Sequence, residues 1–349
     1  MPNRNLKINT KIISDNSDCF IVAEIGHNHQ GNLDICKQMF KSVKECGVDA
    51  VKLQKRHNQR LYTKHFYHHS YESENAFGAT YGLHREALEF SEKEYKELQQ
   101  YAKKLDLIFF ATPFDFESVE FLANLDMPCY KIASGDLKNI PLIKYIAKLG
   151  KPMIISTGGA TMEDVKRAYN AVIPINNKIA FLQCTASYPS NFAELDLHVI
   201  RTYQEEFPNH IIGWSAHDNG IAMAVVAYVL GARIIEKHFT LNHTMKGTDH
   251  AFSLEPIGMR KLVRDLRRTR IALGDGKKKF YESEKGALFK MGKKIVAVRD
   301  LPKRHKISEQ DLVFKSPGDG LHPYMSDYFI GKKLKRAVKE DEALKKTDV

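Results

Sequence analysis

The sequence is short of cysteine, and its cysteines show no pairing. Five are present, far apart, with no spacing typical of a disulfide framework or of a cysteine zinc site. This pattern suits a reducing compartment. The first residues lack the apolar core of a signal peptide, and the longest apolar run, residues 221–232, is too short to span a bilayer. We therefore expect a cytoplasmic protein with no membrane partner.

The sequence also lacks a basic motif interleaved with aromatic residues, although its formal net charge is +11. The lysines are spread over helical patterns and the C-terminal region, which disfavours nucleic acid as a partner. A positive charge of this size can instead attract small anions. A phosphorylated or carboxylated substrate is the better explanation.

A glycine-rich dinucleotide-binding turn is missing too, which argues against a doubly wound open sheet, the main alternative fold. Eight apolar runs alternate with amphipathic helical patterns. The predicted strands are residues 20–25, 50–54, 108–113, 129–134, 152–157, 179–185, 211–217 and 233–240. The predicted helices include 32–46, 92–105, 116–125, 141–149, 162–172, 221–230 and 256–273, and a short hairpin is expected at 11–18. This alternation predicts an α/β fold, a (β/α)8 TIM barrel with its active site at the C-terminal strand ends.

Polar side chains stand at these strand ends, where a buried strand would otherwise be apolar. They are Glu24, Lys52, Gln54, Thr112, Lys131, Ser134, Ser156, Tyr188, Ser215, His217, Glu236 and His238. Each alone could be a structural cap or a solvated residue of the barrel rim. Together they predict one site, in which lysines and hydroxyls bind a phosphate and a carboxylate and a glutamate transfers protons.

His217 and His238 end the last two predicted strands. Neighbouring strands would bring the two imidazoles to one rim, where they can hold a divalent metal and leave positions open for substrate oxygens. The alternative is two unrelated histidines, one of them a core residue that has its hydrogen bonds satisfied.

Two loops are long enough to cover this rim. The insertion at residues 56–90 is rich in tyrosine, histidine and glycine, and its aromatic content favours a lid over disorder. A second loop, residues 242–250, follows the last strand. Its Asp249 is predicted either to bind substrate hydroxyls or to cap a helix.

The pattern changes after the glycine- and lysine-rich stretch at 274–279. Short strands and turns follow, including the turn at 317–320. We predict a barrel domain at residues 1–280, a linker at 281–292 and a small second domain at 293–349, which packs against the barrel of its own or a partner chain.

Several motifs resemble those of the sialic acid (N-acetylneuraminate) synthase family. They are Ala23-Glu24-Ile25-Gly26-His27-Asn28-His29-Gln30-Gly31, Lys131-Ile132-Ala133-Ser134-Gly135, Cys184-Thr185 with Tyr188-Pro189, and Glu236-Lys237-His238-Phe239-Thr240. The tail from Lys293 resembles that family's antifreeze-like (SAF) domain. The likeness covers nearly the whole chain.

The resemblance implies a transferase that condenses phosphoenolpyruvate with N-acetylmannosamine or a related N-acyl hexosamine, assisted by Mn²⁺ or Mg²⁺. It also implies a domain-swapped homodimer in which the tail of one chain closes the barrel of the other. Matched motif by motif, the metal ligands are His217 and His238, and the catalytic residues are these two with Glu24, Lys52 and Tyr188. The substrate-binding positions are Gln54, Asn75, Thr112, Lys131, Ser134, Ser156, Ser215 and Asp249.

Two positions depart from the family pattern. Ala186 stands where the family often has an asparagine that contacts phosphate, and Ser316, beside Lys315, stands where the tail usually has an arginine that reaches the acyl group. The stretches 246–250 and 253–256, together with Tyr81-Gly82 and Glu89-Phe90, look more like the animal-type branch, some of whose enzymes take a 6-phosphorylated sugar.

Other functions stay open at this point. The acceptor can be N-acetylmannosamine, its 6-phosphate, or a diacetamido-deoxy sugar leading to a legionaminic- or pseudaminic-type acid. More distant alternatives are a metal-dependent barrel aldolase or hydrolase, and a non-enzymatic module that binds polyanions or carbohydrates.

Overall fold

Eight parallel strands close into a barrel in the computed structural model, which describes residues 4–349. The strand order around the barrel is β10-β3-β4-β5-β6-β7-β8-β9, so each strand pairs with its neighbour in sequence and the last pairs with the first. The strands are β3 (Phe20–Gly26), β4 (Ala50–Lys55), β5 (Ile108–Pro113), β6 (Tyr130–Ile132), β7 (Met153–Ser156), β8 (Ile179–Cys184), β9 (Ile211–Ala216) and β10 (Ile234–His238). The predicted TIM barrel is confirmed.

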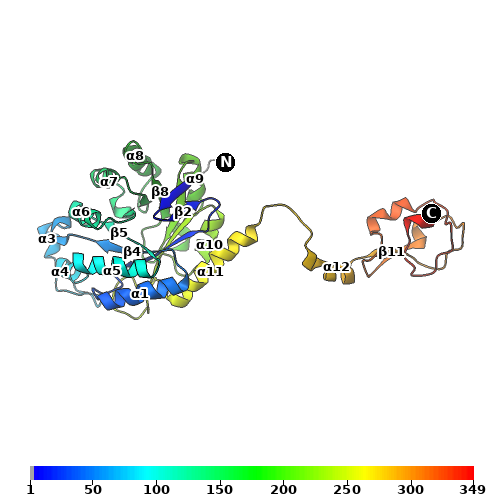
Figure 1. Cartoon of the computed structure of the whole chain (residues 1–349), viewed down its shortest axis with the longest axis horizontal. Coiled ribbons are helices and arrows are strands. Elements are labelled where there is room, and N and C mark those ends of the chain that lie inside the picture. The colour runs from blue at the N-terminus through cyan, green and yellow to red at the C-terminus, as the bar shows by residue number, and fades with distance from the viewer. Residues whose placement is uncertain (1–3) are drawn as a thin grey trace. The chain divides into compact units, whose positions relative to one another are not determined.

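Helices surround this sheet on its outer side (Figure 1). One follows each strand: α1 (Leu33–Cys46), α5 (Glu92–Lys104), α6 (Phe116–Asn124), α7 (Ile140–Ala147), α8 (Met162–Val172), α9 (Val199–Glu206), α10 (Ala222–Val229) and α11 (Pro256–Leu273). Their boundaries follow local signals. Asn32 caps α1, and Ser91 with Glu94 forms a capping box at the start of α5. Because helices cover one face of the sheet and side chains fill the other, almost every strand residue is buried.

A hairpin precedes the barrel, but earlier in the chain than predicted. It consists of β1 (Asn5–Ile8) and β2 (Lys11–Ser14), so residues 11–18 supply only its second strand. The turn needs a residue with positive φ, which Asn9 provides at 52°. Leu6, Ile8 and Ile13 alternate inward and join the buried apolar cluster formed by the first residues of the barrel strands. The hairpin therefore packs against the N-terminal end of the barrel.

The insertion between β4 and α5 is folded. It contains three short helices, α2 (Asn58–Leu61), α3 (Lys64–Tyr67) and α4 (Tyr81–Glu86). The aromatic rings of Tyr62, Phe66 and Tyr81 pack against one another, with centroids 4.5 to 5.6 Å apart. At its C-terminal end, the carbonyl oxygen of Ala87 lies so close to Gly31 (φ +70°) that a Cβ there would be 2.1 Å from it. A glycine is therefore required where the insertion returns to the loop after β3.

A second compact unit spans Asp275–Val349. It contains the antiparallel pair β11 (Lys294–Ala297) and β12 (Leu312–Lys315) and the helix α12 (Lys285–Met291). Four 3₁₀ helices complete it: η3 (Glu282–Glu284), η4 (Glu309–Asp311), η5 (Pro323–Tyr328) and η6 (Lys346–Asp348). It has its own apolar core, which includes Ile295, Leu301, Ile307 and Phe329. The segment 281–292, expected to be a linker, carries η3 and α12. Within residues 4–349 no helix combines the length and apolarity that a bilayer crossing requires.

Candidate active site

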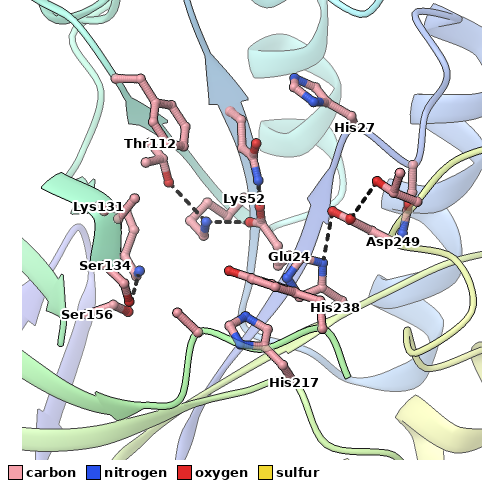
Figure 2. Close-up of a pocket in the computed structure, with 18 of the residues that line it drawn as sticks. Glu24, His27, Lys52, Thr112, Lys131, Ser134, Ser156, His217, His238 and Asp249 are labelled. Atoms are coloured by element: carbon pink, nitrogen blue, oxygen red, sulfur yellow. Dashed lines mark hydrogen bonds and ion pairs between the residues drawn. The ribbon is translucent and has the colours of Figure 1, made fainter. Parts of the chain in front are cut away.

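A cavity of about 580 Å³ opens at the C-terminal ends of the barrel strands. All the predicted site residues except Asn75 line it: Glu24, Lys52, Gln54, Thr112, Lys131, Ser134, Ser156, Tyr188, Ser215, His217, His238 and Asp249. They meet because each strand delivers its last inward-facing side chains to one rim. Figure 2 shows Lys131, Ser134 and Ser156 on one side of this cavity and His27 and Asp249 on the opposite side.

We call the first side the lysine end: Lys52 and Lys131 with the hydroxyls of Thr112, Ser134 and Ser156. The Lys52 ammonium donates to Thr112 Oγ1 at 3.0 Å, and Lys131 Nζ donates to Ser156 Oγ at 2.6 Å. Both lysines are 3% exposed. Burial lowers the pKa of Lys131 from the ordinary lysine value, although the charge of Glu236 opposes this shift.

Two carboxylates neutralise the lysine end. Lys52 Nζ lies 2.5 Å from Glu24 Oε2, and Glu236 Oε1 lies 3.8 Å from Lys52 Nζ and 3.6 Å from Lys131 Nζ. Burial disfavours ionisation of Glu236, but Lys131 and Lys52 outweigh it and lower its pKa to about 2. Glu236 is therefore ionised at neutral pH. The sequence placed Glu236 among the strand-end side chains of the predicted site, but it assigned this residue no catalytic or binding role of its own.

Glu24 stands at the centre of the cavity (Figure 2). In addition to its ion pair with Lys52, it accepts a hydrogen bond from Gln54 Nε2 at 2.7 Å. The carboxylate thus lies within hydrogen-bond reach of two groups at its own rim. A carboxylate held in this way can exchange a proton with a substrate oxygen beside it.

The imidazoles of His217 and His238 lie side by side, with ring centroids 5.3 Å apart. His217 Nδ1 is 2.8 Å from the Thr185 carbonyl oxygen, which fixes this nitrogen as the donor and leaves Nε2 with a lone pair. Burial lowers the pKa of His217 to about 3, so its ring is neutral. His238 Nδ1 is buried without a hydrogen-bond partner in the described chain.

This donor set fits a divalent cation, because neutral imidazoles with free ring nitrogens are metal ligands. Between residues 4 and 349, no group of three or more His, Cys, Asp and Glu side chains is arranged to hold a metal. A cation bound by the pair would therefore take its other ligands from water or substrate. Tyr188 packs over this region, its ring centroid 4.1 Å from that of His217.

Asn75 does not line the cavity. Its Oδ1 accepts a hydrogen bond from the backbone N–H of Gly247 at 2.9 Å. The contact joins the insertion to the loop that carries Asp249, and Gln30 adds a second contact to that loop through the Lys246 carbonyl oxygen at 2.7 Å. Asn75 thus holds two covering segments together.

Three further basic residues line the cavity, and we call them the arginine end: His27, which lies on the side opposite Lys131 in Figure 2, and Arg56 and Arg85, which contact His27. None was predicted as a site residue. His27 stands in a motif that carries the family resemblance, and Arg56 directly follows β4, so both had a sequence signal. Arg85 lies on α4 within the insertion, where no pattern indicated that it would return to the rim.

Comparison with known proteins decides the family. Residues 39–278 match the NeuB family, and residues 294–349 match the SAF domain. The chain belongs to the NeuB (sialic acid synthase) family. This NeuB-family chain is 41% identical to the human N-acetylneuraminate-9-phosphate synthase over 93% of its own length and 91% of the relative's.

Relatives with other product names are similar at comparable levels. The N,N'-diacetyllegionaminic acid synthase of Campylobacter jejuni is 36% identical, over 93% of this chain and 98% of the relative. Among solved structures, the N-acetylneuraminic acid synthetase of Leptospira borgpetersenii superposes with a TM-score of 0.71 at 30% identity, covering 82% of this chain and 95% of that one. Sequence similarity over nearly the whole chain thus extends to synthases that are named for different acids.

Proposed function

We propose that this protein condenses phosphoenolpyruvate with an N-acyl hexosamine, N-acetylmannosamine or a close relative, to give a nine-carbon sialic-type acid and phosphate. The cavity supports this proposal because its polar groups divide into an anion-binding end, a central carboxylate and an imidazole pair. The single observation that carries it is the convergence of Lys52, Lys131, His217 and His238 on one cavity. The names of the human and Campylobacter jejuni relatives, both synthases of acids of this kind, point the same way.

Phosphoenolpyruvate would bind at the lysine end. Its phosphate and carboxylate are strong acceptors. Lys52, Lys131 and Ser156 offer ammonium and hydroxyl donors from buried positions, and Ser134 offers a hydroxyl from a half-buried one. Buried donors fixed before the substrate arrives stabilise the charge that develops as phosphate leaves. The acceptor would then occupy the remainder of the cavity, beside Glu24 and Gln54.

In the reaction, C3 of phosphoenolpyruvate forms a bond to the aldehyde carbon of the open-chain sugar. Water adds at C2, and the C2–O bond to phosphate breaks, so that phosphoenolpyruvate, sugar and water become one nine-carbon acid and phosphate. Glu24 would move the proton at one of two oxygens, that of the attacking water or that of the new hydroxyl. Lys52, 2.5 Å from this carboxylate, would keep it positioned.

His217 and His238 would hold Mn²⁺ or Mg²⁺, which when bound supplies Lewis acidity toward the carbonyl oxygen of the sugar. The chain's own part is to keep the His217 imidazole neutral by burial and to fix its ring through the Thr185 carbonyl oxygen. We further propose, on the resemblance alone, a cytoplasmic homodimer in which each tail closes the partner's barrel.

The test is phosphate release from phosphoenolpyruvate in the presence of Mn²⁺ and a panel of acceptors, with mass spectrometry of the product. The panel contains N-acetylmannosamine, its 6-phosphate and a diacetamido-deoxy hexose. We expect a nine-carbon acid and one phosphate per acceptor consumed. Absence of phosphate release with every acceptor would overturn the proposal. A borohydride-trapped Schiff base with an oxo-acid would instead indicate a lysine-dependent aldolase.

A further inference from the structure

The arginine end is built around one imidazole that faces two guanidinium groups. Arg56 Nη1 lies 3.1 Å from His27 Nε2, and Arg85 Nη1 lies 3.0 Å from His27 Nδ1. Arg56 is 8% exposed, and the side chain of His27 is 10% exposed. The two arginines come from different segments, since Arg56 follows β4 and Arg85 stands on α4 of the insertion.

This arrangement lacks one hydrogen-bond acceptor. A guanidinium only donates, whereas a neutral imidazole has one N–H and one lone pair. His27 can therefore accept from one arginine, and its other nitrogen brings an N–H against an N–H. Protonation would not relieve the conflict, because it would give two such contacts. Burial and the charges of Arg56 and Arg85 in fact lower the pKa of His27 well below its usual value.

No carboxylate neutralises the two guanidinium groups. Along residues 4–349, neither Arg56 nor Arg85 forms an ion pair, and their side-chain partners are Gln54 Oε1, the Tyr81 hydroxyl and the His27 ring. Two acids lie farther from the guanidinium groups: Glu89 pairs with Lys55 at 2.8 Å and has its Oε1 3.8 Å from His27 Nε2, and Asp249 lies 3.7 Å from His238 Nδ1. Among the described residues, the two guanidinium groups thus have no carboxylate within ion-pair distance, and only the more distant charges of Glu89 and Asp249 act on them.

We propose that the arginine end binds a phosphate ester on the acceptor sugar, at the end remote from its aldehyde. This inference rests on the proposed function, which assigns phosphoenolpyruvate to the lysine end and the aldehyde to the neighbourhood of Glu24. The open-chain sugar otherwise offers hydroxyl and amide groups, which cannot neutralise two guanidinium groups. A phosphate supplies the missing acceptors, and its oxygens match the planar fork of arginine.

The test compares acceptors rather than absolute rates. The ratio of kcat/KM for N-acetylmannosamine 6-phosphate to that for N-acetylmannosamine is measured in the full chain and in Arg85→Gln. We expect the unmodified protein to prefer the phosphorylated acceptor and the variant to lower the ratio by about 10- to 100-fold, as for loss of a charge-assisted hydrogen bond. Arg60→Gln is the matched control, because Arg60 lies in the same insertion, is 70% exposed and pairs with Glu117. Its ratio should equal that of the unmodified protein.

The outcomes separate this inference from the proposed function. Three results would overturn the inference. They are an unchanged ratio in Arg85→Gln, a preference of the unmodified protein for the neutral sugar, and a variant that raises the KM for phosphoenolpyruvate in place of the KM for the acceptor.

If no acceptor supports turnover, the proposed function fails. Calorimetric binding of N-acetylmannosamine 6-phosphate then still decides whether the arginine end binds a phosphate ester. Tighter binding to the unmodified protein than to Arg85→Gln supports the phosphate site, and equal or absent binding rejects it. If Arg85→Gln does not fold, Arg85→Lys retains the charge without the fork and is expected to lower the ratio by a smaller factor.

Discussion

The two ends of the cavity treat positive charge in opposite ways. At the lysine end, Glu24 and Glu236 lie within 4 Å of the ammonium groups, so the protein itself balances the charge. At the arginine end the guanidinium groups contact an imidazole, and no acid of residues 4–349 lies within 4 Å of either of them. Buried charge is costly unless it is paired. The difference is therefore one of charge: the lysine end is balanced by carboxylates of the protein, whereas the arginine end keeps positive charge that an anionic group of a ligand could balance.

The largest effect is expected where the two ends meet, at the imidazole pair. Replacing His238 with alanine should abolish metal-dependent turnover, a loss of about 10³-fold or more, because several kcal/mol of charge stabilisation depend on the ligand. The fold should stay intact, as thermal unfolding and circular dichroism can check. His68→Ala, an exposed histidine of the insertion, is the control and should keep full activity. Unchanged turnover in His238→Ala would remove the metal assignment.

A second substitution tests whether the two ends of the cavity bind different substrates. Lys131→Ala should lower kcat/KM for phosphoenolpyruvate by about 10²- to 10³-fold, mostly through a higher KM, because it removes one partner of a buried charge pair. The preference between phosphorylated and neutral acceptors should stay the same. Lys138→Ala is the control, since this lysine is 59% exposed. An unaltered KM for phosphoenolpyruvate would show that its phosphate binds elsewhere.

The smallest effect concerns pH. The lowered pKa of Lys131 means that its proton leaves at a lower pH than that of an exposed lysine, whereas arginine stays charged. Since phosphoenolpyruvate needs the ammonium form, its kcat/KM should be level at low pH and fall up to about tenfold per unit as pH rises through that pKa. The KM of the acceptor should stay level over the same range. Equal falls for both substrates would contradict the assignment of the ends.

The barrel could be predicted because its strands are continuous apolar runs. Ile108–Pro113 and Met162–Val172 were predicted to the residue. The strand expected at 129–134 is shorter, Tyr130–Ile132, because Ser134 already begins the 3₁₀ helix η1 (Ser134–Asp136). Helix α9 was missed altogether. Strand-end side chains such as Lys131 and His217 could be placed at one rim because the parallel topology alone brings them together.

The rest of the site depends on contacts between distant segments. Arg85 reaches His27 only because the insertion folds back over the barrel, and Asn75 bonds to Gly247 for the same reason. Neither contact follows from periodicity or from a strand end. A family motif suggested a substrate role for Asn75, but its partner in the structure is a backbone N–H of another loop.

The hairpin at the start of the chain has a consequence for how products leave. Leu6, Ile8 and Ile13 pack against strand residues and cover the N-terminal end of the barrel, so we expect ligands to enter and leave at the C-terminal strand ends, where the cavity opens. The lysines, 3% exposed, lie deep in it, and the half-buried Arg85 lies nearer the opening. Liberated phosphate would be trapped beneath the larger nine-carbon acid, so we expect an ordered exit in which the acid departs first.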